Sequence, residues 1–173
     1  MLDLDDICLL LIHDAAEVPR HWMYQWEVGY PLVQAVTVDE RECPSVWRQK
    51  LDEVMRNIDG ELLAVAYRTG CNAFAHWLYH AGVNEQRRIT GAILAAPLLT
   101  QWSDDPAAPE NRARVNFRTA LVYGNDAPQA ERLQTIARHL GAKALMTPYG
   151  GDLNAHLGGW QWGMKLMQDI LLD

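Results

Sequence analysis

Residues 62–77 read Leu-Leu-Ala-Val-Ala-Tyr-Arg-Thr-Gly-Cys-Asn-Ala-Phe-Ala-His-Trp. The run Leu62–Ala66 is continuously apolar, which is typical of a strand that is buried on both faces. Gly70 marks a tight turn, and the residues from Cys71 to Ala81 have the spacing of a helix. The stretch therefore predicts a strand, a sharp turn and a helix, with Arg68 at the apex of the turn.

Similar apolar runs alternate with helical patterns along the rest of the chain. The other predicted strands are Ile7–Ile12, Val33–Val38, Ile89–Ala96, Arg118–Tyr123 and Ala142–Thr147, and the other predicted helices are Pro44–Ile58, Ala130–Leu140 and Gly158–Leu172. This alternation with short connections predicts an α/β fold with a doubly wound parallel sheet and helices on both faces. Residues 100–116 are the one long loop, where we expect mobility.

Composition excludes several classes of protein. The chain has 173 residues, enough for one domain, and its formal net charge of −7 argues against a nucleic-acid partner. Its three cysteines are widely spaced and match no zinc or disulfide pattern, and the start of the chain is acidic where a signal peptide would be basic. We therefore expect a soluble, cytoplasmic protein that needs no cofactor or metal and has no membrane segment.

Ligands of doubly wound sheets bind at the carboxyl ends of the strands, so the apex of the quoted turn is a candidate site. A strand, tight turn and helix in this order have the layout of a nucleophile elbow, whose apex presents a catalytic side chain. Here the apex is Arg68, and a guanidinium stays protonated and cannot attack a carbonyl. The sequence thus predicts the scaffold of a hydrolase without its nucleophile.

Several short segments, in one order along the chain, share the pattern of a single family. They are His13-Asp14, Pro19–Trp22 with Trp26-Glu27, Glu42–Pro44 with Trp47, Val65–Trp77, Gly91–Pro97, Asn125-Asp126 and Gly151–Trp160. Together they resemble the small α/β-hydrolases without a cap domain that are related to retinoblastoma-binding protein nine. The resemblance covers nearly the whole chain. With the strand–helix alternation, it implies one domain over residues 1–173 and a six-stranded sheet in the order 2-1-3-4-5-6.

The resemblance also assigns the family's catalytic positions. Members of that family use Ser, Asp and His, and these positions carry Arg68, Asp126 and Asp152 here. Asp14 replaces the Gly that follows the first strand, where a carboxylate would repel the anionic intermediate. The resemblance therefore implies a serine hydrolase with a degenerate catalytic triad, in which no catalytic position except the acid is intact.

Four other polar residues near these ends could take part in chemistry. Thr69 lies one residue past the apex, so its side chain should point elsewhere, and we interpret Cys71 as a buried small residue rather than a nucleophile. We expect the His13 ring to brace loops by hydrogen bonds. His156 follows the missing base and could swing toward the site, although a surface or capping role is the plainer interpretation.

Two further pairs have competing interpretations. His76 and His80 lie four residues apart on one helix, as a metal pair could, but without a third ligand we favour helix packing. Trp102 and Trp162 are the candidates for an exposed contact surface.

Arg68, Asp14, Asp126 and Asp152 all map to one end of the sheet. A half-buried guanidinium persists more easily among carboxylates than alone, so we predict an ion network that closes the old site. The alternative is that the substitutions are drift and that Arg68 extends to water.

Three functions follow from these residues. The first is an inactive hydrolase used for binding an unknown protein partner or small molecule, with a homodimer as one candidate assembly. The second is a hydrolase of small esters or amides with a non-standard site. The third is a binding module for a small anion at Arg68, with Asp14, Asp126, Asp152, His13 and Thr69 around it.

Overall fold

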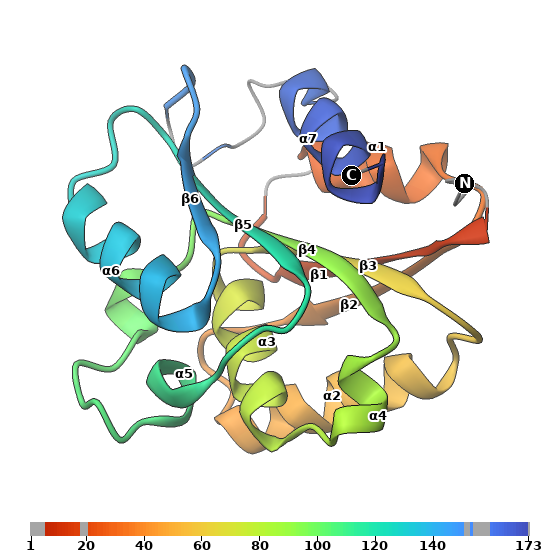
Figure 1. Cartoon of the computed structure of the whole chain (residues 1–173), viewed down its shortest axis with the longest axis horizontal. Helices are drawn as coiled ribbons and strands as arrows, with labels where there is room; N and C mark the ends of the chain where they lie inside the picture. Colours follow the sequence, from red (N-terminus) through yellow and green to blue (C-terminus); the bar gives the residue numbers. More distant parts are fainter. Residues whose placement is uncertain (1–5, 18–20, 151–152, 154–159, 173) are drawn as a thin grey trace.

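A computed structural model describes residues 6–17, 21–150, 153 and 160–172 of the chain. It contains one six-stranded sheet, in which neighbouring strands are parallel throughout and follow the order β2-β1-β3-β4-β5-β6. The strands are β1 (Cys8–Asp14), β2 (Val33–Val38), β3 (Leu62–Tyr67), β4 (Ile89–Ala95), β5 (Arg118–Tyr123) and β6 (Lys143–Met146). The predicted fold and strand order are confirmed (Figure 1).

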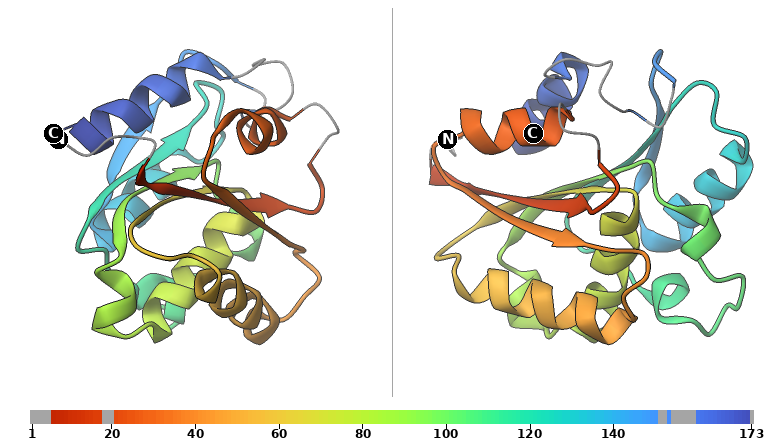
Figure 2. Two further views of the ribbon diagram at one scale, coloured as in Figure 1. Left: turned by 90° about the vertical axis from the view of Figure 1, so that its right-hand side faces the viewer. Right: turned by 180° about the vertical axis from the view of Figure 1, so that it is seen from behind.

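Helices cover both faces of the sheet, which gives three layers (Figure 2). One face carries α1 (Trp22–Gly29) and α7 (Gln161–Leu172), and the other carries α2 (Pro44–Arg56), α3 (Thr69–His80) and α6 (Ala130–Leu140). Each face has its own hydrophobic core, because β1 and β3 are buried along their whole length and send alternate side chains to opposite sides.

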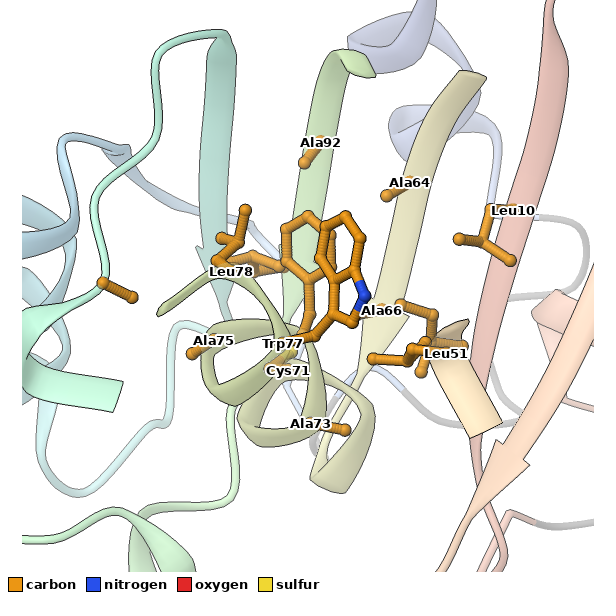
Figure 3. Packing of buried hydrophobic residues seen from close by; sticks show 14 of the residues in the cluster. Leu10, Leu51, Ala64, Ala66, Cys71, Ala73, Ala75, Trp77, Leu78 and Ala92 are labelled. Atoms are coloured by element: carbon orange, nitrogen blue, oxygen red, sulfur yellow. The ribbon is translucent and has the colours of Figure 1, made fainter. Parts of the chain in front are cut away.

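The core beneath α3 pairs a large helix side chain with small strand side chains. Trp77 of α3 extends its indole toward the sheet, where Ala64, Ala66 and Ala92 face it (Figure 3). This complementarity lets α3 pack close to β3, which in turn fixes the turn between them.

Short helical segments appear where the sequence predicts loops. These are α1 itself, α4 (Val83–Gln86), the 3-10 turn η2 (Leu99–Gln101) and α5 (Pro109–Arg112). Helix α1 lacks the usual Ser, Thr, Asp or Asn cap; instead the His21 ring accepts the Met23 N–H. Histidine is not among the residues that mark the beginning of a helix in a sequence, so the sequence analysis did not predict α1.

The stretch 100–116, predicted as one long loop, contains the end of η2 and the short helix α5. Trp102 is only 4% exposed, so its prediction as a contact surface is wrong, whereas Trp162 is half-buried against the α7 side of the core. Glu110 of α5 is also buried and pairs with His76 of α3, which ties this segment to the layer below the sheet. Among the described residues, no helix is long and apolar enough to span a membrane.

Candidate active site at the strand ends

The turn after β3 has the geometry expected of an elbow. Arg68 joins β3 to α3 with φ 49° and ψ −115°, a conformation that non-glycine residues rarely adopt. A Cβ on Gly70 would lie 2.3 Å from the carbonyl oxygen of Ile12 on β1. The first turn of α3 can therefore approach β1 only because residue 70 is glycine.

Asp14 lies against this elbow from the end of β1. Its Oδ2 atom accepts the N–H of Thr69 at 3.1 Å and lies 3.5 Å from Nε of Arg68, while Oδ1 accepts the N–H of Ala16 at 2.8 Å. The Asp14 side chain is 3% exposed and that of Arg68 is 29% exposed. A buried carboxylate is tolerable here because backbone donors and a guanidinium compensate its charge. The predicted contact between Arg68 and Asp14 is thus present.

The backbone N–H groups of Thr69 and of the first residues after β1 have acceptors within the protein. The N–H groups of residues 14–17 donate to the Glu17 carboxylate, the Val38 carbonyl, and the Asp14 side chain and carbonyl, at 2.8–3.0 Å. With the N–H of Thr69 also bound, the described donors next to the apex have acceptors within the protein. Charge-assisted bonds of this kind hold the loop after β1 in place.

A buried polar layer stands behind Asp14. His13 donates from Nδ1 to Glu17 at 2.6 Å, its Nε2 lies 3.4 Å from Glu27, and its ring stacks on Tyr24. His13 therefore braces the loop between β1 and α1, as predicted. Glu17 was not singled out from the sequence, although its position four residues after His13 is a signal that could have found it.

His21 supports the same loop as a neutral ring. Burial, followed by the charge of His13, lowers the pKa of His21 to about 4. Its Nδ1 accepts the Met23 N–H, and its ring lies against Tyr67 of β3 with a centroid distance of 4.2 Å. An uncharged His21 packs here without the cost of a buried cation.

Asp126 lies on the loop after β5, at the same carboxyl end of the sheet as the elbow. Its carboxylate covers Gly150: a Cβ on that glycine would lie 2.6 Å from Oδ2 of Asp126. Asn125 fastens the two loops, since its N–H donates to Tyr149 at 2.9 Å and its amide donates to Pro148 at 2.8 Å. Asp126 is exposed. Asp152 and His156, which sequence analysis also placed here, lie outside the described residues.

The remaining candidates have structural roles. Cys71 is fully buried, and burial raises the pKa of its thiol well above the usual value, so it is not an activated nucleophile. Thr69 is fully buried as well, and its backbone N–H serves Asp14. His76 pairs with Glu110 while His80 is exposed, and the described residues contain no cluster of metal ligands.

Comparison with solved structures places the chain among hydrolase folds. A putative YdeN-like hydrolase from Pectobacterium atrosepticum has a TM-score of 0.78 at 18% identity, covering 95% of this chain and 90% of that one. The ydeN gene product of Bacillus subtilis has a TM-score of 0.70 at 15% identity, covering 96% and 100%. A predicted CIB-like hydrolase from Thermoplasma acidophilum has 0.61 at 12%, covering 99% and 88%. At these identities the likeness shows the fold alone.

No relative was found among curated protein sequences. A family model described as serine hydrolase matches residues 10–169, which include the carboxyl ends of all six strands. The chain therefore belongs to the serine hydrolase family.

Proposed function

We propose that this protein is a catalytically impaired member of its family that acts by binding a protein partner or a small molecule. One observation carries the proposal. The position that should hold a nucleophile holds Arg68, and the N–H of the next residue, Thr69, donates to the protein's own Asp14 carboxylate.

The nucleophile is the first difficulty for catalysis. A serine at an elbow attacks through its hydroxyl oxygen, and the guanidinium of Arg68 is a permanent cation without a nucleophilic lone pair. Neither described residue considered as a substitute replaces it: Cys71 is fully buried with a raised pKa, and the hydroxyl of Thr69 is buried. In a well-studied triad, loss of the nucleophile alone lowers turnover by about a millionfold.

The oxyanion hole is the second difficulty. In α/β hydrolases the backbone N–H after the nucleophile and an N–H from a neighbouring loop stabilise the anionic intermediate. Here the N–H of Thr69 donates to Asp14, and the N–H of Asp14 donates to Glu17. A substrate oxyanion would have to displace one carboxylate and approach another, which costs free energy instead of lowering the barrier.

The resemblance to hydrolases related to retinoblastoma-binding protein nine supports the same proposal. In that pattern the base position carries Asp152, and a carboxylate cannot take over the role of a histidine that is paired with Asp126. The triad positions that the resemblance assigns and the hydrogen bond from the Thr69 N–H to Asp14 are separate arguments, and both support lost turnover.

Anion binding at Arg68 and hydrolysis at a non-standard site are the competing functions. The exposed part of Arg68 favours the first, but Asp14 neutralises this cation, and Glu17 and Asp126 add negative charge to the surroundings. An approaching anion therefore meets a site whose charge is already compensated.

The experiment measures turnover of p-nitrophenyl acetate and labelling by a fluorophosphonate probe. We expect the native chain to match a heat-denatured control in both assays. Turnover well above that control, lost in both Arg68→Ala and Asp126→Ala, would overturn the proposal and favour the non-standard hydrolase. Saturable binding of acetate or phosphate that disappears in Arg68→Ala would favour the anion-binding module.

A further inference from the structure

A second candidate site lies between α6 and residues 102–114, on the face of the sheet that carries α3. It is a cavity of about 320 Å³, here named the α5–α6 cavity. Helices α5 and α6 contact each other on this face (Figure 1). The volume lies at the lower end of the range of about 300–1,000 Å³ that is typical of small-molecule pockets, so the cavity suits a compact ligand.

One wall of the cavity is a single face of α6. Four residues of this helix line the cavity, namely Arg132, Thr135, Ile136 and His139. Their spacing of three, four and seven residues places their side chains on the same face of a helix. Ile136 is buried and belongs to the core, whereas His139 is exposed. This wall therefore extends from the hydrophobic core to the solvent.

The opposite wall is a folded segment whose shape is fixed by hydrogen bonds. The side-chain amide of Asn111 donates to the carbonyls of Ser103 and Asp105 at 2.7 and 2.8 Å. Its Oδ1 atom accepts the indole N–H of Trp102 at 2.9 Å. Arg132 ties this segment to α6, because its Nη2 donates to the Trp102 carbonyl at 2.7 Å. The two walls are thus held together without a ligand, and this preorganisation lowers the entropy cost of binding.

The two arginines of the lining differ in how their charge is compensated. Arg132 forms an ion pair with Asp104 at 3.0 Å, and Asp104 is the acidic group of the lining. Arg114 is exposed and donates from Nη1 to the backbone carbonyls of Asn111 and Ala113, at 3.0 and 2.7 Å. A carbonyl acceptor orients a guanidinium but does not cancel its charge. Within the described part of the chain no carboxylate lies within ion-pair distance of Arg114, so the lining has a net positive charge.

We propose that the α5–α6 cavity binds a small aromatic carboxylate, with the carboxylate at Arg114 and the ring against Pro106 and His139. The carboxylate gains charge-assisted hydrogen bonds from the guanidinium. Pro106 and His139 are both exposed in the lining, and a planar ring that covers them removes apolar surface from water. This inference does not depend on catalysis at the elbow: turnover there would overturn the proposed function and leave binding at the cavity unchanged.

The test titrates the native chain with benzoate and follows backbone amides by two-dimensional NMR. Benzamide supplies the same ring without the charge, and acetate supplies the carboxylate without the ring. We expect saturable shifts from benzoate that are centred on residues 102–114 and 132–139. We also expect benzamide to bind at least about tenfold more weakly, with no saturable shift from acetate.

Substitutions of Arg114 locate the carboxylate. Arg114→Gln should weaken benzoate binding at least about tenfold and leave benzamide binding unchanged. Arg114→Lys keeps the charge without the planar fork and should restore part of the affinity for benzoate. Arg87→Gln removes the same charge from an exposed position outside the lining and should change nothing. Both positions are exposed, so the variants should keep the native circular dichroism spectrum and melting temperature.

Several results would overturn the proposal. These are no saturable shift up to the solubility limit of benzoate, shifts centred outside the two walls, or equal binding of benzamide and benzoate. An Arg114→Gln variant that binds benzoate as tightly as the native chain does would also overturn it. Equal loss of benzoate binding in Arg87→Gln would show a general effect of charge instead of a site. Shifts of the lining amides that follow protein concentration would assign the cavity to a second copy of the chain.

Discussion

Replacing Asp14 by alanine tests the ion pair at the elbow. The change removes the acceptor of the fully buried Thr69 N–H, which costs about 1–3 kcal/mol in a buried setting. Loss of the contact with Arg68, whose side chain is 29% exposed, adds roughly 0–1 kcal/mol. The Ala16 N–H is exposed and can bind water instead, so it adds little.

We therefore expect Asp14→Ala to lower the free energy of unfolding by about 2–3 kcal/mol, or the melting temperature by roughly 4–12 °C. Asp14→Asn keeps an acceptor for Thr69 and should lose only about half as much. Asp59→Ala, an exposed carboxylate removed from a loop, is the control and should stay within about 0.5 kcal/mol of the native chain.

The assay is urea unfolding followed by circular dichroism, with Asp14→Ala, Arg68→Ala and the double variant in one cycle. A coupling energy of about 0.5–1 kcal/mol is expected for this pair, of which only Arg68 is partly exposed. An Asp14→Ala variant as stable as the Asp59→Ala control would refute the role of this carboxylate. If the coupling energy is zero while Asp14→Ala is still destabilised, the ion pair is refuted. The role of the backbone hydrogen bonds to Asp14 then stands.

Three further predictions concern the same fold. Gly70→Ala should destabilise the fold by several kcal/mol or prevent folding, because its Cβ would meet the β1 backbone at 2.3 Å. A Cβ on Gly29 would have nothing within 4 Å, so Gly29→Ala should be tolerated, and thermal melts compare the two variants. The pKa of His21 falls from 6.5 in the unfolded chain to about 4 in the folded chain, so between these values the unfolded chain binds more protons. The free energy of unfolding should therefore drop as the pH falls from 6.5 to 4, and it should drop less steeply in His21→Asn. Iodoacetamide should label Cys43, which is exposed and whose pKa is lowered by its hydrogen bond to Ser45, and it should spare the buried Cys71. Mass spectrometry of protein labelled without denaturant measures both sites, and faster labelling of Cys71 would contradict the prediction.

The strands were predictable because each buried strand is a local apolar run. Val33–Val38 and Arg118–Tyr123 match the structure residue for residue, and the helix Ala130–Leu140 ends where predicted, at a Gly141 with φ 88°. These signals depend on periodicity and backbone conformation, which neighbouring residues set. Segments without such signals, α1 and the turns within 100–116, were missed because tertiary partners hold them.

For the candidate site too, the local features could be predicted from the sequence and the contacts between distant residues could not. The sequence by itself determined the elbow, its arginine apex and the clustering of Asp14 and Asp126 at one edge, because parallel strands end together. Only the tertiary structure decided that Asp14 accepts the Thr69 N–H and lies beside Arg68, and that Glu17 and His13 stand behind it. Those outcomes depend on distances between residues that are far apart in the chain. They also depend on which buried N–H groups lack a backbone acceptor, because a buried carboxylate can then accept their hydrogen bonds.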